Sequence, residues 1–432
     1  MDAAATPRRL AALVLAVAAS VAGGTGTSTG AAAGPLPSTG ILRINGDLAA
    51  VSRPAQYQYV ILNSDQHALI PQLKAANPGL KALVYKDMAA TVSWAAAGAH
   101  LPTGVGYAEA NASHPEWFLT DTTGARIEWC DYPGDWQMDV GSQAYQDAWA
   151  AGVAADLKAH GWDGVMVDDT NASQAWHLCG RTIAKYPTDA AYAAATRSFL
   201  ARVGPALRGQ GFLVVPNIYL PWSPSAADVW SDWISFTSGA VLEYWSKWGK
   251  GPTQHFADAD WTYRQQFLAL TQRAGKVFLG ITYAPADDVR SMRYARASFL
   301  LDWDGGPSAL VFEPGKGVDP GAGEWTADIG TPSGARRQAG GAWRRDYSAG
   351  TVLVNPSASA AATVEVGGRY VLPDGSAPGS VTLPPTSGLV LRSAAAVASP
   401  PAAASAQPAP APSSARSRTF ARMLRLDLRF GP

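Results

Sequence analysis

The chain of 432 residues has few of the side chains that usually make metal or redox sites. It contains two cysteines and six histidines, and no His-x-His or His-Glu-x-x-His pair brings two imidazoles together. Lys and Arg together number 34, as do Asp and Glu, so no net charge attracts nucleic acid or an anionic membrane. Glycine-rich phosphate or dinucleotide fingerprints are also missing where a strand meets a helix. These absences predict no cofactor, no metal site and no nucleic-acid partner.

Long apolar segments are scarce as well. Residues 10–22 are apolar, follow Arg8 and Arg9, and precede a stretch of Gly, Thr and Ser, which is typical of a secretory signal peptide. This run is too short to span a bilayer comfortably, and no later segment is long and apolar enough. We therefore predict a signal peptide over residues 1–30 and a secreted, monomeric protein without stable membrane insertion. An uncleaved anchor is the alternative.

Aromatic residues, by contrast, are plentiful, with 16 Trp and 15 Tyr. Flat rings in this number exceed what a core needs, and rings that line a cleft can stack on sugars. Most of them can still belong to the core.

The region 41–330 alternates short apolar segments with helical patterns, which predicts an α/β fold, specifically a (β/α)8 TIM barrel. A helix expected over 145–160 ends at Gly161, and a strand follows at once at 164–167. Four apolar or small residues without polar alternation suit a strand covered on both faces. The predicted barrel strands are 57–63, 80–85, 136–140, 164–167, 212–215, 239–242, 277–281 and 309–312.

After residue 330 the helical periodicity disappears. Short β-rich segments separated by Gly and Pro predict a small antiparallel β-sandwich over 331–393, with strands at 343–347, 351–355, 363–366 and 389–392. From 394 to 416 the chain is mostly Ala, Pro and Ser, a composition that cannot build a core. We predict a flexible tail over 394–432, in which residues 419–430 could form a short amphipathic helix.

Two acids follow predicted barrel strands and are the candidate catalytic residues. Asp168 follows 164–167 and Glu243 follows 239–242, and barrels of this type build their active sites at the C-terminal ends of the strands. Apolar neighbours would raise the pKa of Glu243. Glycosidic cleavage needs such a pair, since one carboxylate attacks the anomeric carbon or orients water while the other protonates the leaving oxygen. The structural alternatives are that Asp168 or Asp169 caps a following helix or loop, and that Glu243 forms a salt bridge with Lys247 or with an Arg elsewhere.

The remaining candidates are polar or aromatic residues at or near the strand ends, which could bind sugar hydroxyls or stack on sugar rings. They are Asp169, Lys86, Asp139, Asn217, Trp136, Trp222, Trp245 and Tyr283. Each could equally serve packing. Strand alternation directs Asp168 and Asp169 to opposite sides, so only one of the two can face the cleft squarely.

Cys130 and Cys179 form an even pair in a chain that we expect to be exported. An oxidising compartment favours a disulfide, because a metal site would need more Cys or nearby His ligands. The disulfide would tie the loop after the third barrel segment to the loop after Asp168, and we expect both loops at the active-site end of the barrel.

A run of motifs resembles known secreted barrels. Asp163-Gly164-x-x-x-Asp168, preceded by Gly161-Trp162, is similar to the strand-four motif of endo-α-1,4-polygalactosaminidases and of α-galactosidase and dextranase barrels. The chain most resembles a group of glycosyl hydrolase-like barrels, over residues 41–393. The further motifs of this similarity are Tyr85-Lys86-Asp87-Met88, Trp136-Gln137-Met138-Asp139, Val167-Asp168-Asp169-Thr170, Arg345-Asp346-Tyr347 and Val354-Asn355-Pro356.

In the better-understood relatives the strand-four Asp is the nucleophile and a strand-six acid is the general acid/base, which implies these roles for Asp168 and Glu243. The resemblance also implies an α-linked poly- or oligosaccharide substrate and a retaining mechanism. Two other functions stay open. One is a non-catalytic glycan-binding barrel, and the other is a metal-dependent hydrolase with Asp168, Asp169 and His177 as ligands.

Overall fold

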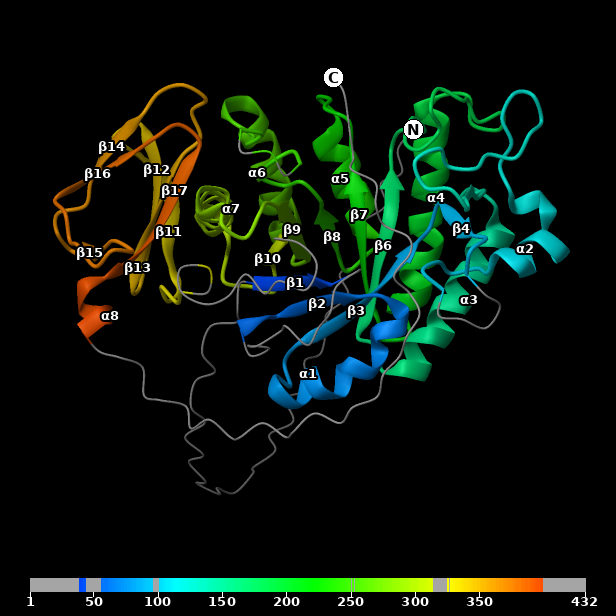
Figure 1. Cartoon of the computed structure of the whole chain (residues 1–432), viewed down its shortest axis with the longest axis horizontal. Helices are drawn as coiled ribbons and strands as arrows, with labels where there is room; N and C mark the ends of the chain where they lie inside the picture. The colour runs from blue at the N-terminus through cyan, green and yellow to red at the C-terminus, as the bar shows by residue number, and fades with distance from the viewer. Residues whose placement is uncertain are drawn as a thin grey trace, which may run out of the picture.

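A computed structural model describes residues 39–43, 56–95, 101–249, 251, 253–313, 325 and 327–398. Within this part of the chain, eight parallel strands close into a barrel in the order β1-β10-β9-β8-β7-β6-β3-β2 (Figure 1). They are β1 (Thr39–Arg43), β2 (Tyr59–Leu62), β3 (Lys81–Asp87), β6 (Gly164–Asn171), β7 (Leu213–Tyr219), β8 (Gly239–Leu242), β9 (Val277–Tyr283) and β10 (Ala309–Glu313). The predicted TIM barrel is confirmed.

One of the predicted barrel strands is wrong. Residues 136–140 do not enter the barrel, because β5 (Asp135–Gln137) pairs antiparallel with β4 (Ala90–Val92) in a separate two-stranded sheet. Its first two residues are only half-buried, unlike those of a strand covered on both faces. The missing barrel strand is β1, which pairs with β2 and β10 and closes the barrel.

Helices cover the outside of the barrel, and α3 shows how they are built. Ser142 accepts a hydrogen bond from the backbone N–H of Tyr145 at its start, and Gly161 ends it in a left-handed conformation with φ 72°. Its buried face includes Trp149, and β6 begins directly after it. The helices are η3 (Ser64–Leu69), α1 (Ile70–Ala76), α2 (Tyr107–Ser113), η4 (Pro115–Trp117), α3 (Gln143–His160), α4 (Asp189–Arg208), α5 (Ala226–Ser235), α6 (Asp258–Arg273) and α7 (Val289–Asp302). In the described ranges no helix combines the length and the apolar composition that crossing a membrane requires.

Two antiparallel sheets follow the barrel, and the larger one packs on α7, which lies between it and the barrel strands (Figure 1). The larger sheet has the order β11-β12-β13-β17-β15, and the smaller one pairs β14 with β16. Their strands are β11 (Pro332–Ala339), β12 (Ala342–Tyr347), β13 (Gly350–Asn355), β14 (Ala362–Glu365), β15 (Tyr370–Val371), β16 (Ser380–Leu383) and β17 (Ser387–Ser393). Leu353, Val364 and Leu383 belong to the small core that the sheets enclose.

The chain continues beyond β17 into α8 (Ala394–Ala398), so the first five residues of the segment predicted as a flexible tail are helical. The rest of that segment lies outside the described residues, and so does the predicted signal peptide at 1–30.

Candidate active site

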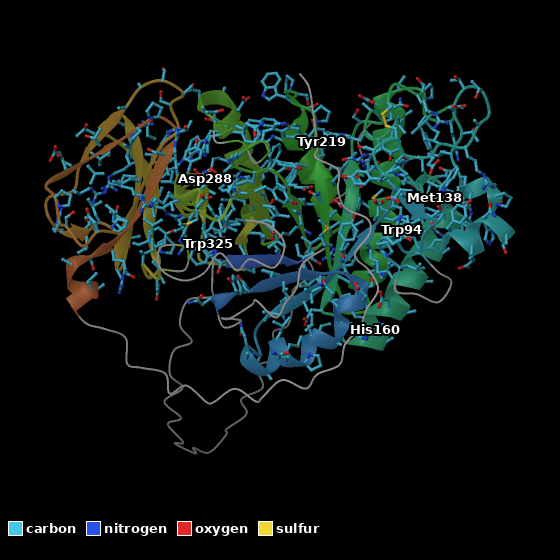
Figure 2. All side chains as sticks on the ribbon, in the orientation of Figure 1. Trp94, Met138, His160, Tyr219, Asp288 and Trp325 are labelled. Atoms are coloured by element: carbon cyan, nitrogen blue, oxygen red, sulfur yellow. A yellow bond between two sulfur atoms is a disulfide. The ribbon has the colours of Figure 1, made fainter. Side chains whose placement is uncertain are left out.

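Side chains that point into the barrel form an apolar layer that ends in polar groups. The layer contains Leu83, Met166, Val215, Val241, Ile281 and Val311. Because strand side chains alternate, the next inward position lies two residues further along each strand. Those positions carry Tyr85, Asp168, Asn217, Glu243, Tyr283 and Glu313. They lie at the C-terminal ends of the strands, where barrels of this type build their active sites. Figure 2 labels Tyr219, the last residue of β7, in its upper part and His160, the last residue of α3, in its lower part.

Asn217 joins the two predicted catalytic acids. Its Nδ2 donates hydrogen bonds to Asp168 Oδ1 at 2.9 Å and to Glu243 Oε2 at 2.8 Å. Since both distances start from one nitrogen, the two carboxyl oxygens are separated by less than their sum. That limit applies to the nearest oxygens of the two groups and agrees with the roughly 5 to 5.5 Å between the carboxyl groups of retaining glycosidases. The backbone N–H of Glu243 donates in turn to Asn217 Oδ1 at 3.3 Å, and Tyr283 donates its hydroxyl to Glu243 Oε1 at 2.7 Å.

The surroundings of this pair favour its protonated forms. Burial raises the pKa of Asp168 to about 7, and the negative charges of Asp169 and Glu243 add to the effect. Burial also raises the pKa of Glu243, although the hydrogen bonds from Tyr283 and Asn217 oppose it. Two close, buried carboxyls titrate as a coupled pair, so the ionisation of one opposes the ionisation of the other.

Asp169 follows Asp168 in the left-handed region, with φ 53°, where β6 carries a register shift against β7. Its Oδ1 accepts a hydrogen bond from Asn171 Nδ2 at 3.2 Å and lies 3.3 Å from His177 Nε2. Burial alone would raise the pKa of Asp169, but the hydrogen bond and charge of His177 lower it below its usual value. Asp169 is therefore the ionised carboxylate of the group.

Asp87, at the end of β3, is a member of this cluster that the sequence analysis did not propose. Its Oδ1 accepts hydrogen bonds from the backbone N–H groups of Ala89 at 2.6 Å and Ala90 at 2.9 Å. Burial and the neighbouring charge of Asp169 hold its pKa well above the usual value. Asp87 and Tyr85 alternate with Lys86 along β3, and reading that alternation forward from the inward Leu83 would have found both.

Lys86 lies on the opposite side of β3, away from this cluster. Its Nζ forms a buried ion pair with Asp156 Oδ2 of α3 at 2.6 Å and donates to Ser64 Oγ at 2.8 Å. Asp139 is also buried elsewhere, where it pairs with Lys185 and Tyr186. The structure therefore does not bring these two polar candidates to Asp168.

Three tryptophans were candidates for stacking on sugar rings. Trp245 is 2% exposed and donates its Nε1 to the carbonyl of Arg264 at 3.4 Å, so it belongs to the core. Trp136 is half-buried on β5 and packs at 6.0 Å from the ring of Tyr107. Only Trp222, in the loop after β7, presents an open ring, with 69% of its surface exposed.

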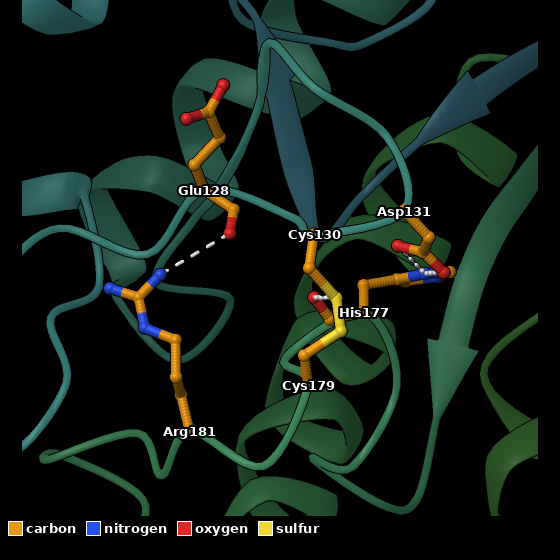
Figure 3. The surroundings of a disulfide bond; sticks show 6 residues. All are labelled: Glu128, Cys130, Asp131, His177, Cys179 and Arg181. Atoms are coloured by element: carbon orange, nitrogen blue, oxygen red, sulfur yellow. Dashed lines mark hydrogen bonds and ion pairs between the residues drawn. A yellow bond between two sulfur atoms is a disulfide. The ribbon is translucent and has the colours of Figure 1, made fainter.

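The disulfide between Cys130 and Cys179 is confirmed, and it joins the loop before β5 to the loop after β6 (Figure 3). In the described segments no group of three or more His, Cys, Asp and Glu side chains is arranged to hold a metal ion.

Comparison with known proteins identifies the family. Residues 74–351, from α1 into β13, match hypothetical glycosyl hydrolase family 15. No curated protein matches the chain. Solved structures with a similar fold include the glycoside hydrolase domain of PelA from Pseudomonas aeruginosa, with 16% identity and a TM-score of 0.42 over 64% of this chain and 96% of that one. Aspergillus fumigatus Ega3 in complex with galactosamine has 12% identity and a TM-score of 0.41 over 65% and 92%. An Anoxybacillus α-amylase has 7% identity and a TM-score of 0.46 over 80% and 89%.

Proposed function

Since the chain belongs to hypothetical glycosyl hydrolase family 15 and is a glycoside hydrolase, we propose that Asp168 and Glu243 cleave α-linked bonds of a poly- or oligosaccharide with retention. The observation that carries this proposal is the single amide of Asn217, which donates to both carboxyls and keeps them close together. Retaining enzymes need this short spacing, because the nucleophile must reach the anomeric carbon without an intervening water.

In the first step Asp168 attacks the anomeric carbon and forms a glycosyl ester, while Glu243 protonates the departing glycosidic oxygen. In the second step the ionised Glu243 takes a proton from water, and the water attacks the anomeric carbon and releases Asp168. Two features support these roles. Burial keeps a proton on Glu243 at higher pH than usual, and Tyr283 and Asn217 hold both of its oxygens.

The substrate and the compartment are further parts of the proposal. The α-linkage rests on the resemblance of the motif around Asp168 to α-acting barrels. Asp169, which follows Asp168, and the exposed Trp222 in the loop after β7 are the proposed sugar-binding groups. Export through the N-terminal segment is supported by the pattern of its residues and by the disulfide, which forms in oxidising compartments.

The test is the release of reducing ends from a panel of α-linked polysaccharides and galactosamine-rich exopolysaccharides. Asp168→Asn and Glu243→Gln should each lower kcat by roughly 10³-fold, because each removes one chemical role. Asp147→Asn, which changes an exposed carboxylate of α3, should leave kcat unchanged. The anomer released first, followed by NMR, should keep the substrate's configuration. Full turnover by either active-site variant, or an inverted first product, would contradict the proposal.

A further inference from the structure

His177 lies beside the catalytic pair and has no part in the mechanism above. Its Nδ1 contacts both oxygens of Asp131 at 2.9 and 2.8 Å, and its Nε2 faces Asp169 Oδ1 at 3.3 Å. The ring stacks on Trp129 at 4.1 Å between centroids, and its side chain is 13% exposed. A ring with a carboxylate at each nitrogen must donate from both, and only the imidazolium can do so.

The charged surroundings agree with this geometry. Burial lowers the pKa of His177, but the hydrogen bonds and charges of Asp169 and Asp131 outweigh burial and raise it to about 9. Burial raises the pKa of the nearby Asp135 to about 6, and the charge of His177 opposes that rise. The nearby Arg181 is turned away, because its guanidinium binds Asp121 at 2.9 Å.

The disulfide links the segment that carries His177 to the segment that carries its partner Asp131 (Figure 3). Cys130 precedes Asp131, and Cys179 lies two residues after His177, so one covalent bond fixes both partners of the ion pair. The backbone N–H of Cys130 donates to the carbonyl of His177 at 3.1 Å. His177 and Cys179 have φ values of 61° and 47°. Such conformations persist for side chains other than Gly only where the surroundings over-determine them, as the covalent link does here.

His177 also contacts Asp169, the residue that follows the proposed nucleophile Asp168. Asp169 is itself left-handed and directly follows Asp168 at the register shift of β6, so contacts that hold Asp169 also restrict the backbone next to Asp168. The side chains that contact Asp169 are His177, Asn171 and Asp87, whose pKa burial holds well above its usual value. Of these three, only His177 carries a positive charge.

We propose that His177 is a positioning residue, a disulfide-anchored imidazolium that keeps Asp169 ionised and left-handed and thereby fixes the carboxyl of Asp168 for attack. The catalytic part rests on the proposed function, whereas the charge of His177 does not.

The charge is tested on the full chain with ¹⁵N-labelled histidine, by following the ring nitrogens of His177 through a pH titration. We expect a midpoint near 9 in the wild type. Asp131→Asn removes one counter-charge and should lower the midpoint by about one unit or more. A wild-type midpoint near the usual value of about 6.5 would overturn the proposal, whether or not a substrate is known.

Positioning is tested by the kinetics of His177→Gln, which keeps a donor but loses the charge. On any substrate that the panel identifies, kcat should fall about tenfold or more with KM nearly unchanged, the pattern expected when an interaction made only in the transition state is lost. His114→Gln, which changes an exposed histidine stacked on Trp117, is the control and should retain full kcat. A His177→Gln kcat within about twofold of the wild type would overturn the positioning role, even with a high titration midpoint.

Cys130→Ser/Cys179→Ser tests the anchor and should lower both kcat and the His177 midpoint. If that variant does not fold, reduction of the wild type with a phosphine should give the same two changes, and reoxidation should reverse them. Unchanged kcat and midpoint in the reduced protein would remove the disulfide from the proposal. Failure of the proposed function is distinguishable, because it would appear as full turnover by Asp168→Asn together with a high His177 midpoint.

Discussion

Asn217 lies where a charged side chain would disturb the two carboxyls on either side of it. A lysine there would attract both as anions, lower both pKa values and remove the proton that an acid catalyst needs. An aspartate would add a third negative charge. The amide has two N–H bonds and no net charge, so it donates one hydrogen to Asp168 and one to Glu243 without deciding which of them is ionised.

Tyr283 affects only one member of the pair, and removing its hydroxyl therefore gives a directional prediction. The hydrogen bond from Tyr283 lowers the pKa of Glu243, so Tyr283→Phe should raise that pKa. A general acid must be protonated, and activity is lost as the pH rises through its pKa. The alkaline limb of the kcat/KM profile should consequently move to higher pH, by about half a unit to one unit.

Tyr244→Phe is the matched control for Tyr283→Phe. The ring of Tyr244 packs against Tyr283 at 5.1 Å, but the hydrogen bond to Glu243 comes from Tyr283. The alkaline limb of the kcat/KM profile of Tyr244→Phe should stay at the wild-type pH. A shift of equal size in both variants, or a shift of the Tyr283→Phe limb to lower pH, would exclude Glu243 as the acid.

The sequence predicted Asp168, Glu243, Asn217 and Tyr283 because each follows an apolar strand, and the structure brings these four together. The prediction from sequence failed where the direction of a side chain decided its role, because a residue near a strand end can face the inside or the outside of the barrel. Lys86 was chosen over Asp87 for that reason. His177 appeared only as a metal-ligand alternative, since its partners Asp131 and Asp169 are 46 and 8 residues away and a disulfide brings the loops together.

Strand prediction failed for a different reason at the level of elements. Residues 136–140 combine Trp, Met and Val, which favour a strand, but the strand that forms is a short antiparallel one outside the barrel. β1 has only five residues, and Gly40 pairs so closely that a Cβ there would lie 3.1 Å from Val311. A glycine in a short segment favours the prediction of a turn. In β1 the glycine instead permits the close approach of neighbouring strands.

Arg345 of β12 makes several of the hydrogen bonds that join this strand to the C-terminal end of α7, and Tyr347 adds one to the carbonyl of Leu300. Arg345 Nη1 donates to the carbonyls of Leu300 at 3.2 Å, Leu301 at 3.1 Å and Trp303 at 2.5 Å, and its Nε donates to Gly334 at 2.9 Å. The last carbonyls of a helix have no partners within the helix, and a cation there also complements the helix dipole. Arg345 therefore closes the C-terminal end of α7 and joins the barrel to the antiparallel sheets.

Arg345→Met keeps the bulk of the side chain but removes the donor of the Leu301 and Trp303 carbonyls, whereas Tyr347 still donates to the carbonyl of Leu300. The free energy of unfolding should fall by about 2–4 kcal/mol, measured as a lower urea midpoint by tryptophan fluorescence. Arg337→Met, at an exposed ion pair of the same sheet region, should change it by less than about 0.5 kcal/mol. Equal shifts in the two variants would show that capping α7 adds nothing to stability.

At the scale of the whole molecule, the carboxyl groups buried at the C-terminal end of the barrel lower the stability of the folded state. Asp87, Asp168, Asp169 and Glu243 lie together, and burial is the largest influence raising the pKa values of Asp87, Asp168 and Glu243. A protein with residues arranged for catalysis is commonly less stable than the same protein with uncharged residues at those positions. The stabilising free energy must come from the rest of the fold. The apolar layer beneath the acids and the helices packed around the barrel provide it by burying apolar surface.

That cost should depend on pH in a defined direction. The pKa of Asp168 rises from 3.8 to about 7 on folding, so the folded state holds this proton more tightly than the unfolded chain. Its contribution to stability is fully present below pH 4 and is lost as the pH rises toward about 7. Asp168→Asn cannot ionise and still offers an oxygen to Asn217. It should be more stable than the wild type at pH 8, by on the order of 2 kcal/mol, with the difference vanishing near pH 4. Urea midpoints at pH 4, 6 and 8 measure it. A variant that is less stable at pH 8, or equally stabilised at every pH, would mean that Asp168 is not the ionised, buried carboxylate that nucleophilic attack requires.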